Sequence, residues 1–338
     1  MKRPLVKAGP VGPDTLRFQL DDLISACEQH CRFCPRSFDQ RRPAPGGAEL
    51  EARVRDRFQQ ALAMYPQRDV VLLSSDILRW PDLFGLLDLA AAAARRVTLL
   101  TPGLDLDDPA FADRFIGRPV RFDLTWLAGE PEAWARVTGR ADSFARVDAA
   151  VRNLRARGLP FRLSTVVTRD NVDVLPETLA SAAAHGVRHF TVRMFYPDYA
   201  QPKSSYYDQF PTFEQLGSAL ARAAALDLDL TVDLTNTPWC QIDLAAIAPL
   251  RVFMRAERPP QNTHPTDGLA ACATCAVSHT CVRVHTSYLE RHAAGVPAAA
   301  QIQANLDHSA QLLASLGPER DLHGRRTEGW VAPTPEAR

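Results

Sequence analysis

Three cysteines stand close together near the start of the chain, in the stretch CEQHCRFCP, and their type and spacing suit metal chemistry. Cys27, Cys31 and Cys34 follow the spacing C-x3-C-x2-C. Structural zinc sites use four protein ligands, and iron–sulfur clusters are usually held by four thiolates. Three thiolates therefore predict a metal group with one open position, unless a neighbouring histidine such as His30 completes a structural zinc site.

Four further cysteines lie in the last third of the chain. They are Cys240, in TPWCQI, and Cys272, Cys275 and Cys281, in CATCAVSHTC. Four thiolates can ligate one [4Fe–4S] cluster fully. A structural zinc site of all four, or of three with His279 or His285, is the alternative, because zinc and iron–sulfur clusters both bind thiolates. A second alternative is an open three-cysteine cluster with Cys240 elsewhere.

Composition limits the classes of partner. The 338 residues include 39 Lys and Arg and 39 Asp and Glu, so the net charge is zero and the basic footprint of a nucleic-acid binder is missing. No apolar run reaches the length of a membrane span, and the first residues, MKRPLVKAGPVGPD, lack the apolar segment of a secretory signal. We therefore expect a cytoplasmic protein with no membrane partner. An odd number of cysteines, seven, in that reducing compartment argues against disulfides.

Between the two cysteine groups, short apolar runs alternate with helical patterns. The predicted strands are TLRFQLD, DVVLLSS, RVTLLTP, PVRFDLTW, FRLSTVVT and HFTVRMFYP. About six strand–helix units predict a parallel sheet and an α/β fold, a partial (β/α)6 barrel. Such a barrel places its chemistry at the C-terminal ends of the strands, and the three-cysteine stretch directly follows the first predicted strand.

The chain changes character after about Thr231, where one further strand, TVDLTNTPWC, leads into a segment rich in Pro, His and Cys. We expect this segment to form a small cluster-binding subdomain, followed by a C-terminal helix in VPAAAQIQANLDHSAQLLASLG. The expected divisions are an N-terminal extension (1–14), the barrel (15–230), the cluster subdomain with its helix (231–317) and a mobile tail (318–338).

The stretch CEQHCRFCP resembles the C-x3-C-x-Φ-C motif of the radical S-adenosylmethionine (SAM) superfamily, with Phe33 as the aromatic Φ. The resemblance implies that Cys27, Cys31 and Cys34 hold a [4Fe–4S] cluster whose open iron binds SAM. It further implies reductive cleavage of SAM to a 5′-deoxyadenosyl radical, which abstracts a substrate hydrogen atom. An external electron donor of the flavodoxin or ferredoxin type is implied as well.

The stretch SSDILRWPDL is similar to the GGEP…HPDL segment that many members carry after the second strand. Ser74, Ser75 and Asp76 replace Gly-Gly-Glu in this chain. The resemblance implies that Asp76 accepts from the ammonium group of the methionine moiety. The alternative is an aspartate that only caps a helix or turn.

The middle of the chain, WARVTGRADSFARVDAAVRNL and then RLSTVVTRDNVDVL, resembles peptide- and natural-product-modifying members. That resemblance implies contacts of Thr125, Arg136 and Ser164 with the SAM ribose and carboxylate. Arg193, at the end of the sixth predicted strand, is placed to hold a carboxylate.

The loop FYPDYAQPKSSYYDQFP, Phe195–Pro211, contains four of the six tyrosines. It leaves the strand end that faces the barrel mouth, so it either lines the substrate site or forms a surface loop with packed tyrosines. His185 and His189 flank a helix–strand junction, and we expect them to be structural.

The C-terminal cysteines resemble the auxiliary-cluster module of the superfamily (twitch/SPASM-like), in the shorter form with one extra cluster. The resemblance implies two [4Fe–4S] clusters and a radical SAM oxidoreductase or maturase of natural product biosynthesis. We expect a ribosomal peptide as substrate, with a crosslink, thioether or epimer as product, and a separate leader-peptide-binding protein. Dehydrogenation, epimerisation or rearrangement of a small molecule, such as an amino sugar or amino acid, is the alternative, and an iron–sulfur electron carrier or sensor is a third.

Overall fold

The computed structural model describes residues 6–10, 14–20, 27–34, 47–195, 208–254, 268–278, 281–292, 294 and 299–315. In this part of the chain one sheet of nine strands runs in chain order. The strands are β1 (Lys7–Pro10), β2 (Thr15–Gln19), β3 (Asp69–Leu73), β4 (Arg96–Thr101), β5 (Val120–Thr125), β6 (Phe161–Val167), β7 (His189–Met194), β8 (Thr231–Thr235) and β9 (Arg251–Met254). β1 pairs antiparallel with β2, and every later pair is parallel.

Helices follow most of the strands. They are α1 (Ala48–Met64), α2 (Leu83–Ala92), α3 (Pro109–Asp113), α4 (Pro131–Thr138), α5 (Ser143–Ala156), α6 (Leu175–Ala184), α8 (Phe213–Ala224), α9 (Thr286–Leu289) and α10 (Ala299–Ser315). Single 3-10 turns are η2 (Ile77–Arg79), η3 (Leu104–Asp107), η4 (Val172–Val174), η5 (Ala245–Ile247) and η6 (Ala270–Thr274). Among the helices found here, none is long and apolar enough to span a membrane.

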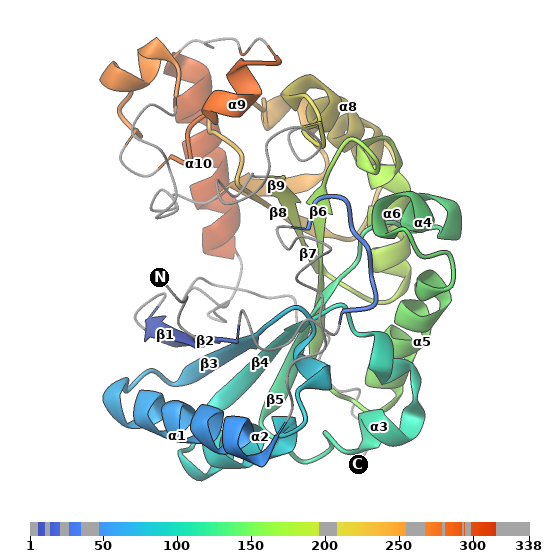
Figure 1. Cartoon of the computed structure of the whole chain (residues 1–338). Helices are drawn as coiled ribbons and strands as arrows, with labels where there is room; N and C mark the ends of the chain where they lie inside the picture. The colour runs from blue at the N-terminus through green and yellow to red at the C-terminus, as the bar shows by residue number, and fades with distance from the viewer. Residues whose placement is uncertain are drawn as a thin grey trace.

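The sheet curves into an arch whose two edges, β1 and β9, do not meet, and the connecting helices cover its outer side (Figure 1). This is the predicted partial barrel. Right-handed crossovers place successive helices on one face of a parallel sheet, which explains the single outer layer. The prediction of an α/β fold with a parallel sheet is confirmed.

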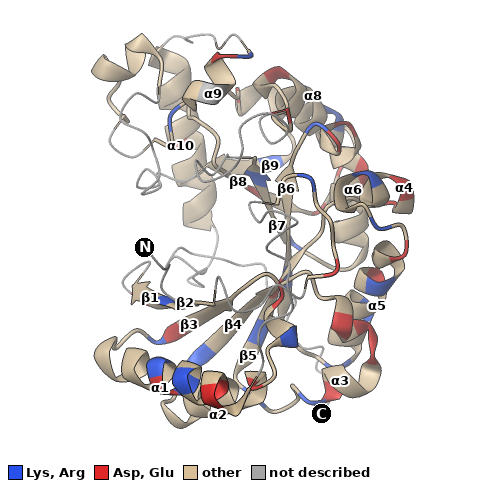
Figure 2. Cartoon of the chain, viewed as in Figure 1, with Lys and Arg blue, Asp and Glu red and all other residues tan. Residues whose placement is uncertain are grey.

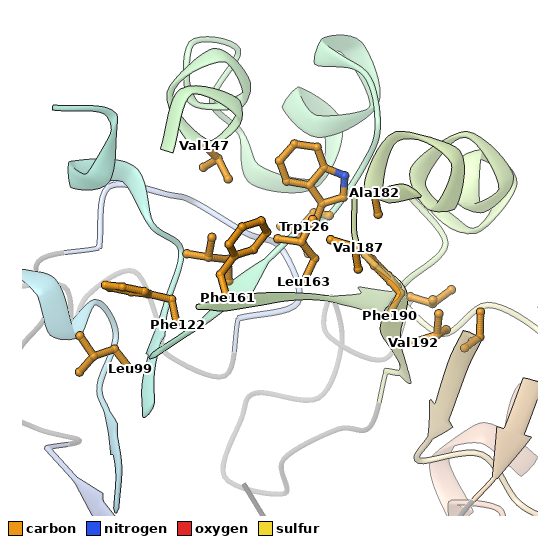
Figure 3. Packing of buried hydrophobic residues seen from close by; sticks show 14 of the residues in the cluster. Leu99, Phe122, Trp126, Val147, Phe161, Leu163, Ala182, Val187, Phe190 and Val192 are labelled. Carbon is orange, nitrogen blue, oxygen red and sulfur yellow. The ribbon is translucent and has the colours of Figure 1, made fainter. Parts of the chain in front are cut away.

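Alternate strand residues form the core between sheet and helices. Phe122, Phe161 and Phe190 on neighbouring strands are fully buried, and Figure 3 shows them in one layer with Val147 and Ala182 of the covering helices. Truncating a buried Phe to Ala costs about 3–5 kcal/mol. Because side chains alternate between the two faces of a strand, the residues between these aromatics point into the arch.

The inner face of the arch is polar near its centre. Thr125 of β5 lies in register with Ser164 of β6, Ser164 with Thr191 of β7, and Thr191 with Asp233 of β8. These four side chains face the concave side, Thr125 at the C-terminal end of its strand and the other three near the middle of theirs. A group inside the arch therefore meets hydroxyls and a carboxylate on one wall.

Two strands lie outside the predicted set. β1 forms within residues 7–10, which the sequence analysis treated as an extension, and β9 forms within the cysteine-rich C-terminal segment. The C-terminal helix is present as α10 and contacts β9. Figure 2 shows Lys or Arg and Asp or Glu interspersed over the outer helices. The predicted tail and most of the tyrosine loop, residues 196–207, lie outside the described residues.

Candidate active site and second cysteine site

The three-cysteine loop follows the C-terminal end of β2 and lies against the C-terminal end of α4. Within Cys27–Cys34, the His30 amide donates to the Thr138 carbonyl at 2.7 Å. The Arg32 amide donates to the Val137 carbonyl at 3.4 Å. These two bonds satisfy carbonyls that a helix end leaves open, so they fix the loop and cap α4 together.

A glycine permits this close approach. Gly139 ends α4 with a φ of 68°, and a Cβ at this position would lie 3.2 Å from the His30 Cβ. Glycine adopts this left-handed backbone conformation with less strain than other residues do. Arg32 adds an ion pair with Asp170, at 3.1 Å, at the other side of the loop.

Glu28, directly after the first cysteine, joins the loop to three other segments. Its Oε1 lies 2.8 Å from Arg79 Nη1 on η2, and its Oε2 lies 2.8 Å from Arg146 Nη1 on α5. Arg79 also pairs with Asp105 of η3 at 2.7 Å, and Arg146 pairs with Asp107 at 2.7 Å. Burial raises the pKa of Glu28, but hydrogen bonds and charges from the two arginines outweigh it and lower the pKa. The network ties the cysteine loop to the turns that follow β3 and β4.

Asp76 is fully buried at the turn after β3 and caps η2. Its Oδ1 accepts from the Thr101 hydroxyl at 2.7 Å and from the Leu78 amide at 3.2 Å. Among the described residues, its Oδ2 has no hydrogen-bond partner and lies 4.0 Å from Arg79 Nε. Burial raises the pKa of Asp76 to about 6. The capping role is therefore real, and it leaves one buried carboxylate oxygen available to a ligand.

Ser164 and Arg193 lie together over a buried carboxylate. Arg193 Nη1 donates to Ser164 Oγ at 2.9 Å, and Ser164 Oγ donates to Asp123 Oδ1 at 3.1 Å. Arg162 donates to Asp123 Oδ2 at 2.5 Å. Burial raises the pKa of Asp123, but the charges of Arg162 and Arg193 and the hydrogen bonds from Arg162 and Ser164 outweigh it and lower the pKa. The anion holds both arginines inside the arch.

The other candidate residues are spread more widely. Thr125 ends β5 beside Ser164, whereas Arg136 lies on the exposed side of α4. Ser74 and Ser75 directly follow β3, and the Ser74 hydroxyl is buried with no hydrogen-bond partner in the described part. Phe33 packs against the hydrophobic core from the cysteine loop.

The second cysteine group surrounds a cavity. Cys240, Cys272, Cys275 and Cys281 line it together with Pro238, Trp239, Val277, Ser278, Arg283, Val284 and Ile302. Its empty volume is about 320 Å³, which includes open solvent. Burial raises the pKa values of Cys240 and Cys281. His285 is buried against Phe210, with ring centroids 6.3 Å apart, and is not among the residues that line the cavity. His279 lies outside the described residues.

Polar contacts already reach two of these sulfurs. Gln241 Nε2 donates to Cys240 Sγ at 3.0 Å, and the Arg283 amide donates to Cys281 Sγ at 3.4 Å. Gly268 makes room beside Cys272, because a Cβ there would lie 3.2 Å from the Cys272 sulfur.

Asn305 of α10 holds the loop that carries Cys240. Its Nδ2 donates to the carbonyls of Trp239 (2.9 Å) and Ile242 (2.7 Å), and its Oδ1 accepts from the Leu244 amide at 3.1 Å. Asn305 is 1% exposed, so these bonds replace water that the amide would otherwise bind. The C-terminal helix thus positions the cysteine nearest the barrel.

None of the seven cysteines forms a disulfide. No set of three His, Cys, Asp or Glu side chains in the described ranges is arranged to hold a single metal ion. At the second site the four sulfurs instead border a shared cavity. Two orphaned polar atoms near the first site, Asp76 Oδ2 and the amide nitrogen of Gln29, are buried without a hydrogen bond from the described residues. Four thiolates around one cavity match the ligand set of a [4Fe–4S] cluster, and the unpaired Asp76 oxygen suits a hydrogen-bond donor such as an ammonium group.

Sequence reasoning missed several residues of the first site. Glu28, Arg79 and Arg146 are charged residues on three separate segments and look like ordinary surface positions in the sequence. Asp123 and Arg162 carried a usable signal, since each is a charge between buried apolar neighbours in a predicted strand. His185 contacts Trp126, with ring centroids 5.3 Å apart, and Asp148, in keeping with its expected structural role.

The fold and the cysteine loop define a radical SAM enzyme domain, with the loop after the first parallel strand of an open barrel. A comparison with protein-family models agrees, because the model described as the radical SAM superfamily matches residues 23–182. This part of the chain belongs to the radical SAM superfamily. Its members use a [4Fe–4S] cluster and SAM.

Curated relatives match about half of the chain. The chain is 28% identical over 167 residues to a PqqA peptide cyclase of Gluconobacter oxydans, a match that covers 49% of this chain and 46% of the relative. It is 24% identical over 177 residues to an AdoMet-dependent heme synthase of Methanosarcina barkeri, covering 52% and 50%. The chain thus spans about half the length of the curated relatives it matches.

Solved structures share the fold. SuiB of Streptococcus suis, bound to its precursor peptide SuiA, has a TM-score of 0.54 at 11% identity, covering 83% of this chain and 74% of that chain. anSMEcpe with bound AdoMet has a TM-score of 0.50 at 14% identity, covering 62% and 59%. At these identities the likeness establishes the fold.

Proposed function

We propose that this protein is a radical SAM maturase that modifies a ribosomally made peptide by a crosslink, a thioether or an epimerisation. The similarity to a PqqA peptide cyclase over 167 residues carries this proposal. The modified residue would enter the open side of the arch, toward the C-terminal ends of the strands, where parallel barrels place their chemistry. SuiB, which shares the fold and was solved with its precursor peptide SuiA, supports a peptide as the substrate.

In this proposal Cys27, Cys31 and Cys34 hold the [4Fe–4S] cluster, and SAM binds beside them. When bound, these groups supply the electron and the 5′-deoxyadenosyl radical that abstracts a hydrogen atom from the substrate. The chain's own task is to position and shield them. The Glu28 network fixes the loop from one side, and the bonds to α4 fix it from the other.

The strand ends would hold SAM. The free Oδ2 of Asp76 is placed to accept from the methionine ammonium, and Ser74 and Ser75 border the same turn. Thr125 and Ser164, in register on adjacent strands, would contact the ribose. Arg193, kept in place by Asp123, would hold a carboxylate, while Arg136 on the exposed side of α4 would have to contact SAM from outside the arch.

Cys240, Cys272, Cys275 and Cys281 would hold a second [4Fe–4S] cluster. The four cysteines line one cavity, and four thiolates are the number that ligates a [4Fe–4S] cluster fully. The apolar side chains in its wall would shield a cluster from solvent. Partners of the whole enzyme would include an electron donor of the flavodoxin or ferredoxin type and a leader-peptide-binding protein.

The test uses the reconstituted protein under anaerobic conditions with SAM and dithionite. The probes are the short peptides encoded beside its gene and, as a comparison, a panel of amino acids and amino sugars. We expect 5′-deoxyadenosine and a peptide that has lost two hydrogen atoms, or one that incorporates deuterium from D2O at unchanged connectivity. Turnover of the small molecules without change in any peptide would overturn the peptide assignment.

A small-molecule substrate is the second candidate, because the match to an AdoMet-dependent heme synthase covers a similar part of the chain. The reaction would be a dehydrogenation, epimerisation or rearrangement. The same experiment separates the two candidates, since 5′-deoxyadenosine formation would then rise with a small molecule and not with peptide.

A further inference from the structure

Gln29 lies between the first two cysteines, and its side chain is buried without full hydrogen bonding. The residue is 4% exposed. Its Oε1 accepts from the Cys31 thiol at 3.6 Å, and its Nε2 has no hydrogen-bond partner among the described residues. A buried amide N–H without a partner destabilises the fold, because the group has lost its hydrogen bond to water. Such a group in a site calls for an explanation.

Contacts of both neighbouring residues fix the chain on either side of Gln29. On one side Glu28 is held by Arg79 and Arg146, each at 2.8 Å. On the other side the His30 amide donates to the Thr138 carbonyl at 2.7 Å. With both neighbours fixed, the side chain keeps its buried place beside Cys31. The terminal amide group of Gln29 can still rotate.

The two orientations of the Gln29 side-chain amide suit two states of Cys31, the thiol and the iron-bound thiolate. A thiol carries a proton and donates to Oε1, and this is the contact at 3.6 Å. A cysteine that ligates iron is a thiolate and only accepts. If Oε1 points toward the thiolate sulfur, two electron-rich atoms meet. If Nε2 points toward the sulfur, the sulfur accepts an N–H hydrogen bond. Turning the amide by half a rotation exchanges the two atoms at nearly constant shape.

We infer that Gln29 donates an N–H···S hydrogen bond from Nε2 to Cys31 Sγ once the cluster is bound. The inference rests on the proposed role of Cys31 as a ligand, and it makes Gln29 a positioning residue that acts through Cys31. The bond gives the orphaned Nε2 its partner. It also places a donor beside sulfur that becomes more negative when the cluster gains an electron, so it favours the reduced cluster.

The second cysteine site shows the same chemistry already in place. There Gln241 Nε2 donates to Cys240 Sγ at 3.0 Å. An amide nitrogen can therefore approach a cysteine sulfur at this distance in this protein. At the first site the partner would be the sulfur of Cys31.

The test compares Gln29→Met and Gln29→Glu with wild type as reconstituted full-length protein. Methionine keeps the length and removes both polar atoms, whereas glutamate keeps the shape and offers only acceptors. The readout is the reduction potential of the cluster whose electron paramagnetic resonance signal changes when SAM is added. For Gln29→Met we expect up to about a tenfold shift of the oxidised-to-reduced ratio toward the oxidised form, which is 59 mV for a one-electron couple. Gln29→Glu should shift the ratio further in the same direction.

The control variant is Gln303→Met, which replaces an exposed glutamine of α10 that donates to Asp307 at 2.9 Å. Its SAM-responsive cluster should keep the wild-type potential. If Gln29→Met fails to retain its cluster, wild type grown with amide-nitrogen-labelled glutamine still decides, because the bond predicts a nitrogen hyperfine coupling to the SAM-responsive cluster. No coupling, or unchanged potentials in both Gln29 variants, overturns the inference alone. A wild-type chain without any SAM-responsive cluster overturns the proposed function and this inference together.

Discussion

The two cysteine sites differ in the residues that surround them, charged at the first and mainly apolar at the second. The first is a loop fixed by charge, in which Glu28 joins Arg79 and Arg146 and only three cysteines contribute. The second is a mainly apolar wall closed by α10, where four cysteines border one cavity. Ion pairs and a buried carboxylate suit a site that binds a charged, exchangeable ligand. An apolar wall suits a group that stays bound and shielded.

This difference predicts that only the first site performs chemistry on SAM. The variant Cys27→Ala/Cys31→Ala/Cys34→Ala should lose all SAM cleavage and keep about four of roughly eight irons after anaerobic reconstitution. Iron and sulfide analysis, zinc analysis and 5′-deoxyadenosine assay check this. Formation of 5′-deoxyadenosine by the variant would refute the assignment of the first site, and one zinc without sulfide would refute the iron–sulfur assignment of the second.

The buried carboxylate of Asp76 should destabilise the folded chain when it is charged, and the same charge should help to bind SAM. A pKa of about 6 in the folded chain, against the ordinary 3.8, means that the folded state holds the Asp76 proton more tightly. Stability from this group is therefore fully present below about pH 4 and is lost as pH rises to about 6. The difference of about two units corresponds to about 3 kcal/mol.

Asp76→Asn removes the charge and keeps the amide oxygen that Thr101 and Leu78 contact. Urea unfolding of the unreconstituted protein should show a variant more stable than wild type by about 3 kcal/mol above pH 6, with the gain shrinking toward acid pH. SAM affinity should fall by about 1.5–3 kcal/mol. Asp82→Asn, at the ion pair with the half-exposed Arg55, serves as control. A gain in stability that does not depend on pH would contradict the raised pKa of Asp76. An unchanged affinity for SAM would mean that Asp76 only caps η2.

The second site should depend on a packed helix rather than on ion pairs. Asn305→Ala removes three hydrogen bonds from the loop around Cys240 and leaves buried backbone groups unsatisfied. We expect a loss of about 2–3 kcal/mol in the free energy of unfolding and a weaker hold on the second cluster. The measurement is urea unfolding together with iron content and the SAM-responsive signal, which should persist. Gln303→Ala on the exposed side of the same helix is the matched control, and equal losses in both variants would deny Asn305 this role.

The sequence predicted the barrel well and the second site in part. The strands β2 to β7 are short apolar runs, and helical patterns lie between them in the sequence. Each strand was therefore predictable from its run of apolar residues. β1, KAGP, and β9, RVFM, are four residues each and became strands only through their neighbours in the sheet. The Glu28 network could not be predicted, because its members are up to 118 residues apart and each looks like a surface charge. Asn305 looked like an ordinary polar residue of a helix for the same reason.

The smallest expected effect concerns Arg283, a charged side chain in the otherwise mainly apolar wall of the second cavity. Its backbone amide donates to Cys281 Sγ at 3.4 Å, and its Nη2 donates to the Ser278 carbonyl at 3.5 Å. A fixed positive charge beside a cluster stabilises the reduced, more negative state, and the low-dielectric wall screens it little. Arg283→Met keeps most of the stem and the backbone amide while removing the charge. The potential of the second cluster should then fall by about 30–60 mV, a threefold to tenfold change in the one-electron ratio.

The first cluster should keep its potential in Arg283→Met, because its own charges come from the Glu28 network on the other side of the arch. Arg251→Met, on β9 and paired with Asp229 at 3.0 Å, controls for the loss of one positive charge elsewhere in the C-terminal region. Potentiometric titration with and without SAM resolves the two clusters by their spectra. A shift shared equally by both clusters, or the same shift in Arg251→Met, would mean a general field effect. The second site would then be tuned by the whole charge of the molecule rather than by one arginine in its wall.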